Sequence, residues 1–527
     1  MKSLRRPNLD WGLIGSPQLN VKGRSLYLSR QIRANLWEEI VCSVFSNCST
    51  EVIRLNMMVC LSDRNCVAFE SLGSPGWSRE GLVPYFKAPT RTSQSKTFGP
   101  SEEEKSRFKV DFDPSIHGTS RPLRRTFPKR VSDVLDPFIE GMASLGVPYN
   151  SDSVRFYTSY YEPVKAHSNL LVLTGAQATR VIFASSLDGS GNLVASGVEY
   201  SKDSQLHTVF ATREVLLCAG SFKTPQLPEL SGAFESLSAL PRRRLPSCTA
   251  MRRAESRCRD GVCRDAIIIA ADSVATPRLS APHGGTARQS APRKGLNAVI
   301  HEQALATRMF LTPMDHFWLP FIIETDLKME TPLGPARVVL FITLRHYSEE
   351  SKSANAPAVL DQGTHSLRPS LDTLNKECFG GNSIPFLEIG LVPGFLPTPR
   401  RTPEAGKSYC TFLLVHLHPF SGGMVHIASA DPLAPPAIDH NILDNQVDVA
   451  IWVDAITEVI PGHAVQLTDA EVEDFVRGAV DTIYHPVGTA VMLPRNDGAV
   501  DSSLKLYGTS NLRVVTEHVI RPPLGPD

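Results

Sequence analysis

The sequence predicts an α/β fold, and three observations predict it. The apolar run Glu214 to Ala219 is followed by Gly220-Ser221 and a Pro-containing segment, a pattern typical of a strand, a turn and a helix. Two β-rich runs, at 169–181 and 197–200, flank a turn rich in Gly, Asp and Asn and indicate a hairpin or a meander. The segment 470–482 is amphipathic at helical spacing. Strands and helices therefore share the chain.

The second half of the chain continues this alternation. Thr468 or Asp469 can cap the helix expected at 470–482, because a short oxygen-bearing side chain accepts a hydrogen bond from the first helical turn. The remaining predicted elements are an ordered segment, a polar loop and two strands, at 309–326, 348–362, 409–416 and 424–428.

Composition and charge narrow the class of protein. The 527 residues are 42% hydrophobic and 20% charged, so a globular chain of two to four domains, or one two-lobed enzyme, is expected. Lys plus Arg and Asp plus Glu balance at 54 each, which favours small neutral partners over nucleic acid or an anionic membrane. The amino terminus makes a poor secretory signal, long apolar runs are missing, and ten cysteines are scattered, so we expect a cytoplasmic location with reduced thiols.

The stretch Tyr484 to Thr489 (YHPVGT) is the most informative. Pro486 and Gly488 tie the backbone into one turn that can aim the imidazole of His485 into a pocket. A histidine with a pKa near 6.5 can accept an alcohol proton near neutral pH. A lone histidine is more often a hydrogen-bonded structural residue. Here, however, Asp497 to Asp501 and Leu506 to Val515 follow, and the whole segment resembles the carboxy-terminal signature of the glucose-methanol-choline (GMC) oxidoreductase family.

A second match supports the resemblance. Arg213 to Gly232 resembles the family's other signature, where a strand and a glycine turn pass beside the flavin, although an ordinary strand-to-helix turn would look alike. Weaker similarities follow in the family's order, at Gly23 to Ser25, at Asn56 to Val59, at the strand around Ala178 and at Asp315-His316.

The resemblance implies a fold, a cofactor and a reaction. The expected architecture is an incomplete Rossmann-like FAD-binding domain beside a second, mixed-sheet α+β substrate domain. FAD would oxidise a primary or secondary alcohol to an aldehyde or ketone, in the manner of fungal alcohol oxidases and dehydrogenases of secondary metabolism, with oxygen or another electron acceptor. His485 would be the catalytic base, and no metal is expected. On aromatic content alone, Phe317 and Trp318 suit a pocket for an aryl or terpenoid alcohol. The cofactor-binding residues would be Ala178, Gly220, Ser221, Asn56 and Thr489.

Several features depart from the family. The GxGxxG turn that would hold the pyrophosphate is missing, and bulky residues between Arg30 and Asn56 replace a second glycine-rich loop. The family's second catalytic residue, a His or Asn, would fall at or just beyond Asp527. Two alternatives therefore stay open: a catalytically inactive remnant, or a non-redox lyase or cyclase on the same fold.

The resemblance predicts four regions. Residues 1–240 would be a flavin-binding part without its first dinucleotide turn, followed by an atypical Arg- and Cys-rich segment at 241–311. Residues 312–465 would be a substrate-binding part, and 466–527 a truncated carboxy-terminal segment that returns to the flavin domain. The composition of segment 241–311 resembles that of translated noncoding or frame-shifted sequence. Sequencing of the transcript would test whether these residues are encoded in frame. A zinc site there is a remote alternative to exposed thiols, with candidate ligands Cys248, Cys258, Cys263 and His283.

Overall fold

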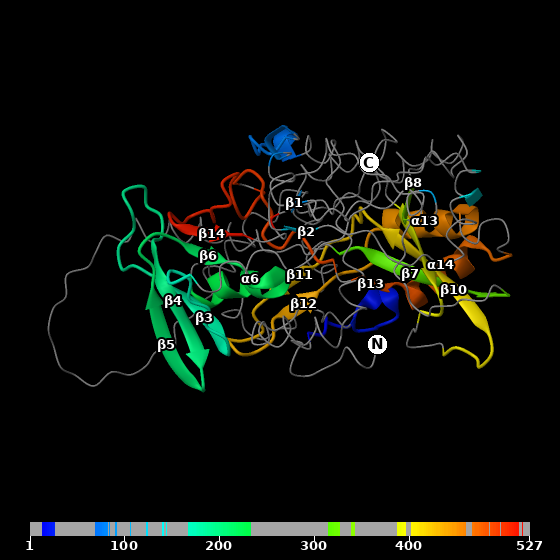
Figure 1. Ribbon diagram of the computed structural model, residues 1–527, viewed down its shortest axis with the longest axis horizontal. Helices are drawn as coiled ribbons and strands as arrows, with labels where there is room; N and C mark the ends of the chain where they lie inside the picture. Colours follow the sequence, from blue (N-terminus) through cyan, green and yellow to red (C-terminus); the bar gives the residue numbers. More distant parts are fainter. Residues whose placement is uncertain are drawn as a thin grey trace, which may run out of the picture.

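A computed structural model gives the arrangement of the chain (Figure 1). Besides short pieces and single residues, it describes the following ranges: 13–26, 69–78, 167–232, 315–326, 339–342, 387–396, 402–459, 466–483, 485–495 and 497–515. The predicted segment around Asn56, the polar loop at 348–362 and the candidate zinc ligands lie outside the described residues.

A five-stranded sheet forms one side of the molecule (Figure 1). Its order is β13-β7-β10-β9-β8, and each described pair in it is antiparallel. The strands are rich in aromatic and β-branched residues, which suit a half-buried pleated surface. Their bounds are β7 Phe317–Thr325, β8 Val339–Ile342, β9 Leu387–Pro393, β10 Ser408–His416 and β13 Asp481–Thr482.

Two helices lie near this sheet. In α14 (Asp469–Ala479), Thr468 and Glu471 form a reciprocal capping box, so the predicted Thr468 cap is confirmed, although the helix ends before 482. In α13 (Gln446–Asp454), the side chain of Asn445 accepts a hydrogen bond from the Val447 backbone N–H. A π-helical turn, Ala455–Val459, continues α13. The buried apolar side chains of α13, α14 and the sheet form one hydrophobic core.

The opposite side of the molecule holds a three-stranded antiparallel sheet, β3-β4-β5 (Figure 1). Its strands are β3 Ala176–Phe183, β4 Ala195–Lys202 and β5 Gln205–Phe210, so the predicted meander is confirmed but begins later than 169. Nearby, β6 (Val215–Leu217) pairs in parallel with β14 (Leu512–Val514). Parallel pairing joins segments about 300 residues apart in the sequence, which brings the carboxy-terminal signature beside the turn after β6.

Helix α6 (Gly220–Leu230) lies between the two sides of the molecule (Figure 1). The strand, turn and helix predicted for this segment are confirmed, but Pro225 and Pro228 both lie inside the helix rather than in its first turn. Internal prolines remove helical hydrogen bonds, so tertiary packing must hold this helix. The packing is extensive, because every residue from 221 to 229 is buried.

A buried hydrogen bond fastens α6 to a neighbouring hairpin. The hairpin consists of β11 (Met424–His426) and β12 (Ala437–Asp439). Glu229, in the last turn of α6, lies 2.7 Å from Nδ1 of His426 and accepts a second bond, of 2.8 Å, from the Ile427 backbone N–H. These contacts fix the carboxy-terminal end of α6. Gly220 and Ser221 lie at its amino-terminal end.

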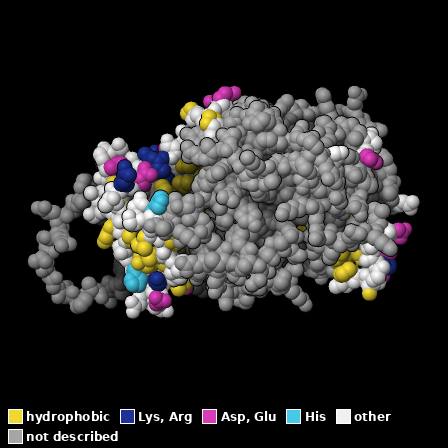
Figure 2. Space-filling model, viewed as in Figure 1, with side chains coloured by type: hydrophobic (Ala, Val, Ile, Leu, Met, Phe, Trp, Pro, Cys, Tyr) yellow, Lys and Arg dark blue, Asp and Glu magenta, His cyan; other side chains and the backbone are white. Residues whose placement is uncertain are grey.

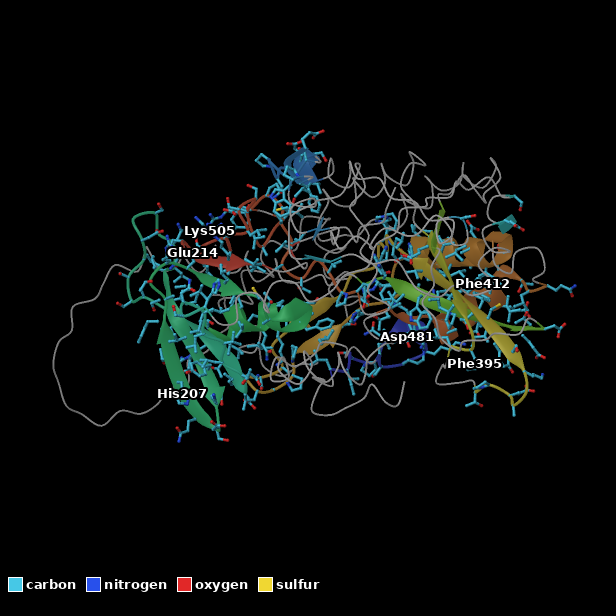
Figure 3. The ribbon with its side chains drawn as sticks, in the orientation of Figure 1. His207, Glu214, Phe395, Phe412, Asp481 and Lys505 are labelled. Carbon is cyan, nitrogen blue, oxygen red and sulfur yellow. The ribbon has the colours of Figure 1, made fainter. Side chains whose placement is uncertain are left out.

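The edge strand β5 of the three-stranded sheet is exposed along its whole length. All six residues of β5 are exposed, and Figure 2 shows apolar side chains gathered at this end of the molecule. Among them are Leu206, Val209 and Phe210. His207 marks the same strand in Figure 3. The sheet core faces inward, where Val181 and Ala195 join the second hydrophobic core.

Candidate active site

Asp315 and His316 come directly before β7, at the end of the five-stranded sheet that lies toward α6. Both side chains are buried, with exposed fractions of 1% and 8%. Strand β13 pairs with the start of β7, with Thr482 opposite Phe317. In Figure 3, Asp481 marks this end of the sheet, whereas Phe395 and Phe412 lie farther from α6. The chain that leaves β13 therefore passes beside Asp315 and His316.

The carboxylate of Asp315 organises the turn that carries His485. Its Oδ1 accepts a 2.9 Å hydrogen bond from the His485 backbone N–H, and its Oδ2 accepts one from the Thr482 hydroxyl. A third group, Nε2 of His440, lies 3.5 Å from the same Oδ2. Hydrogen bonds to a buried carboxylate are strong and directional. Asp315 thus fixes the backbone position of His485.

The rings of His316 and His485 meet edge to face. Their Nδ1 atoms lie 3.1 Å apart, and the ring planes make an angle of 74°. Burial lowers the pKa of His316 well below its usual value, and nearby His485, His418 and His416 lower it further, so His316 is neutral at physiological pH. His485 itself is exposed. The pair therefore joins a buried, neutral imidazole to the imidazole of an exposed residue.

The predicted signature residues converge on this place. The Ser221 hydroxyl, in the first turn of α6, donates a 2.7 Å hydrogen bond to the carbonyl of Pro486. Gly220 and Gly488 both have positive φ, of 81° and 76°, which a side chain would disfavour. The turn after β6 and the turn after β13 are thus joined directly. This contact brings the two family-like segments together in space.

Thr489 offers a test of whether a cofactor fits. Its side chain is fully buried, and its hydroxyl has no hydrogen-bond partner among the residues that the structure describes. A buried hydroxyl without a partner is costly, so a bound group that supplies one is favoured. The Ser221–Pro486 hydrogen bond joins this turn to the amino end of α6, whose backbone N–H groups suit an anionic or hydrogen-bond-accepting part of a bound group. The residues present therefore fit a flavin dinucleotide on this side.

Other predicted residues lie elsewhere. Ala178 is exposed on β3, pairs with Tyr200, and precedes a register shift at Thr179 that bends the strand. Phe317 is fully buried in the core beneath the five-stranded sheet. The indole N–H of Trp318 donates to the Thr482 carbonyl at 2.9 Å. Phe317 and Trp318 thus support the β7–β13 pairing that carries His485.

The sequence pattern singled out Asp315 and His316 only as a weak similarity. Neither was predicted as a site residue, although both contact His485. The available signal was an adjacent Asp-His pair before a β-rich run. That pair can be assigned to the site only when β13 is known to pair with β7, because this pairing brings it beside His485. Within the residues that the structure describes, no three His, Cys, Asp or Glu side chains could together hold a metal ion.

Comparisons with known proteins agree with this geometry. Residues 132–237 match the amino-terminal part, and residues 457–523 the carboxy-terminal part, of the family described as GMC oxidoreductase. The chain belongs to the GMC oxidoreductase family. The two matched regions contain Gly220, Ser221, His485 and Thr489. The chain is therefore an oxidoreductase with an α/β fold, and its cofactor is FAD.

Curated relatives of this GMC oxidoreductase include fungal and mycobacterial proteins. The GMC oxidoreductase family protein Mala s 12 of Malassezia sympodialis is 25% identical over 497 residues, which cover 85% of this chain and 70% of the relative. Dehydrogenase xptC of Emericella nidulans is 26% identical over 504 residues, with 85% and 72% covered. The alignment spans most of both proteins in each case.

Solved structures share the fold of this GMC oxidoreductase. An FAD-dependent oxidoreductase from Chaetomium thermophilum superposes with a TM-score of 0.68 at 18% identity, covering 98% of this chain and 86% of the other. A fungal aryl-alcohol oxidase gives a TM-score of 0.64, also at 18% identity, with 98% and 86% covered. Within its described part, the structure contains no helix with the length and apolar character needed to cross a membrane.

Proposed function

We propose that this GMC oxidoreductase oxidises a primary or secondary alcohol to an aldehyde or ketone, with His485 as the base that accepts the hydroxyl proton. The observation that supports it is the placement of His485. The residue is exposed, its backbone N–H is held by Asp315 at 2.9 Å, and the following Pro486 contacts Ser221 at 2.7 Å. A reachable base is thus fixed beside the residues that fit the cofactor.

The flavin supplies the acceptor for the hydride that leaves the alcohol carbon. The chain supplies the proton acceptor and the orientation. Gly220, Ser221 and Thr489 would hold FAD, and Ala178 and Asn56 complete the cofactor-binding set that we propose. Electrons then pass to oxygen or to another small acceptor.

We also propose that the four sequence regions act as units of this function. The flavin-binding part at 1–240 and the carboxy-terminal segment at 466–527 hold FAD together, and the part at 312–465 faces the substrate. Two contacts support this division: β6 pairs with β14, and Ser221 bonds to Pro486.

An aryl alcohol is the first substrate to test, because a solved structure with this fold is described as an aryl-alcohol oxidase. Purified full-length chain is incubated with FAD and desalted, and its visible absorption spectrum is recorded. Alcohols of aryl, terpenoid, aliphatic and sugar type are then added without oxygen. Bleaching of bound flavin by an alcohol, with formation of the aldehyde or ketone, supports the proposal.

His485→Asn provides the matched control. It should retain flavin and lose bleaching by about 100-fold or more, because general base catalysis contributes on the order of 10²–10⁴ in rate. Wild-type protein that binds FAD but is bleached by no alcohol would contradict alcohol oxidation. Product formed without bleaching would indicate a non-redox reaction on the same fold. Reoxidation in air, followed by oxygen consumption, separates an oxidase from a dehydrogenase.

A further inference from the structure

The inner ring nitrogen of His485 has an unusual partner. In many catalytic sites a carboxylate bonds to the imidazole of the base and selects its tautomer. Here the carboxylate of Asp315 is engaged by the His485 backbone N–H and the Thr482 hydroxyl instead. Nδ1 of His485 faces Nδ1 of His316 at 3.1 Å. A second imidazole therefore occupies the position of the orienting group.

His316 is suited to this task because it stays neutral. Its side chain is buried, and burial is the main cause that lowers its pKa, followed by the positive charges that His485, His418 and His416 would carry. The backbone carbonyl of Leu417 acts in the opposite direction. A neutral imidazole keeps one N–H and one lone pair, so it can accept a hydrogen bond at Nδ1.

Two arrangements of the shared hydrogen atom are possible, and they differ in chemistry. If His316 donates, Nδ1 of neutral His485 is an acceptor, its proton sits on Nε2, and Nε2 cannot take up another. If His485 donates, its Nε2 is unprotonated and available. After Nε2 accepts a proton, Nδ1 still carries its hydrogen and still needs an acceptor. Only the second arrangement keeps the same hydrogen bond before and after proton transfer.

We propose that His316 is a positioning residue that accepts a hydrogen bond from Nδ1–H of His485 and so leaves Nε2 of His485 as the proton acceptor. The proposal rests on the proposed oxidation of an alcohol. In that reaction the O–H bond breaks and its proton passes to Nε2. The C–H bond breaks with its electron pair, which passes to the flavin as hydride, and the carbon–oxygen double bond forms.

Two substitutions separate this role from mere packing. The carboxamide of His316→Asn places an oxygen near the former Nδ1 and can accept the same hydrogen bond. His316→Leu fills space but accepts no hydrogen bond. His426→Asn is the matched control, since it removes another buried histidine, one that contacts Glu229 rather than His485. Thermal unfolding of each full-length variant shows whether it is folded.

The decisive measurement is the tautomer of His485. Full-length chain labelled with ¹⁵N-histidine is incubated with FAD, and the ring nitrogens are observed by NMR, with the His485 signals assigned by their loss in His485→Gln. We expect Nδ1–H in wild type, in His316→Asn and in His426→Asn. We expect a shift toward Nε2–H in His316→Leu. An Nε2–H form in wild-type protein would overturn the proposal, whatever the activity.

The second measurement is the rate of flavin reduction by alcohol. His316→Leu should lower kcat by about 10-fold or more with little change in KM. A base in the wrong tautomer cannot accept the proton, but substrate binding does not depend on that tautomer. His316→Asn should restore most of the rate. Equal losses in the Asn and Leu variants would contradict an acceptor role. If His485 carries Nδ1–H but no alcohol reduces the flavin of wild-type protein, the proposed function fails and the tautomer assignment stands.

Discussion

The carboxylate of Asp315 joins two segments that are 170 residues apart, since its Oδ1 accepts a 2.9 Å hydrogen bond from the His485 backbone N–H. Its other oxygen accepts from Thr482, so both oxygens hold the same short stretch of chain. Because Asp315 lies two residues before β7, the position of His485 is defined by the rigid five-stranded sheet rather than by a loop alone.

Replacement of Asp315 should damage stability and activity together. In Asp315→Ala, the His485 N–H and the Thr482 hydroxyl lose their acceptor, and we expect a loss of about 3 kcal/mol in the free energy of unfolding. Asp315→Asn keeps one oxygen acceptor and should lose less. Urea unfolding monitors the first quantity and flavin reduction by alcohol the second. An alanine variant as stable and active as wild type would contradict the role of Asp315.

Replacement of Thr489 should affect FAD binding but not lower the stability of the FAD-free chain. Within the described part of the chain its buried hydroxyl has no hydrogen-bond partner, so Thr489→Val should leave the FAD-free chain as stable as wild type or more stable. The same variant should bind FAD more weakly by about 1 kcal/mol, or roughly 5-fold, if the cofactor is the missing partner. Thermal unfolding without FAD and fluorescence titration with FAD measure the two effects.

Thr411 provides the control for Thr489. Its buried hydroxyl donates a 2.8 Å hydrogen bond to the carbonyl of Gly394. Thr411→Val should therefore lower the stability of the FAD-free chain by about 1 kcal/mol and leave FAD affinity unchanged. If both valine variants behave alike, Thr489 has no specific relation to the cofactor.

The sequence predicted local structure well where short-range signals suffice. The Thr468 cap and the strand at 409–416 follow from side chains within a few residues, and both are present, the strand as β10. The site was predicted less completely. His485 was the predicted base, and Asp315 and His316 reach it only because β13 pairs with β7. No local pattern encodes a pairing between segments so far apart. Likewise, Phe317 was predicted as a pocket residue on aromatic content alone, and that content does not reveal which face of β7 is buried.

His416 should make stability fall in mild acid. Burial lowers its pKa from 6.5 to about 3, with a further contribution from His418. The unfolded chain therefore binds more protons than the folded chain below pH 6.5, and stability is lost as pH falls. Between pH 6.5 and 5 the loss from this residue is about 2 kcal/mol. His316, whose pKa is also lowered, adds to it.

Asp448 opposes this trend. Its Oδ1 lies 4.0 Å from Nδ1 of His416, but burial raises the pKa of Asp448 to about 6, so both groups favour their neutral forms and the contact is not an ion pair at low pH. The comparison of His416→Gln with wild type isolates the histidine. We expect the variant to lose less stability between pH 6.5 and 5, measured by urea unfolding. Parallel pH curves for the two proteins would show that His416 does not titrate as stated.

Glu388, on β9, should produce the reverse dependence at higher pH. Burial raises the pKa of its carboxyl from 4.5 to about 7, so the folded chain binds this proton more tightly than the unfolded chain does. Stability from this group is fully present below pH 4.5 and is lost as pH rises to about 7. Glu388→Gln removes the ionisation, and it should raise the free energy of unfolding at pH 8 by up to about 3 kcal/mol while leaving it nearly unchanged at pH 4. The exposed pair of Lys407 and Glu324 on the same sheet supplies the control, because Glu324→Gln should change stability by less than about 1 kcal/mol at either pH. If Glu388→Gln stabilises the chain equally at pH 4 and pH 8, the effect comes from packing and not from a buried charge.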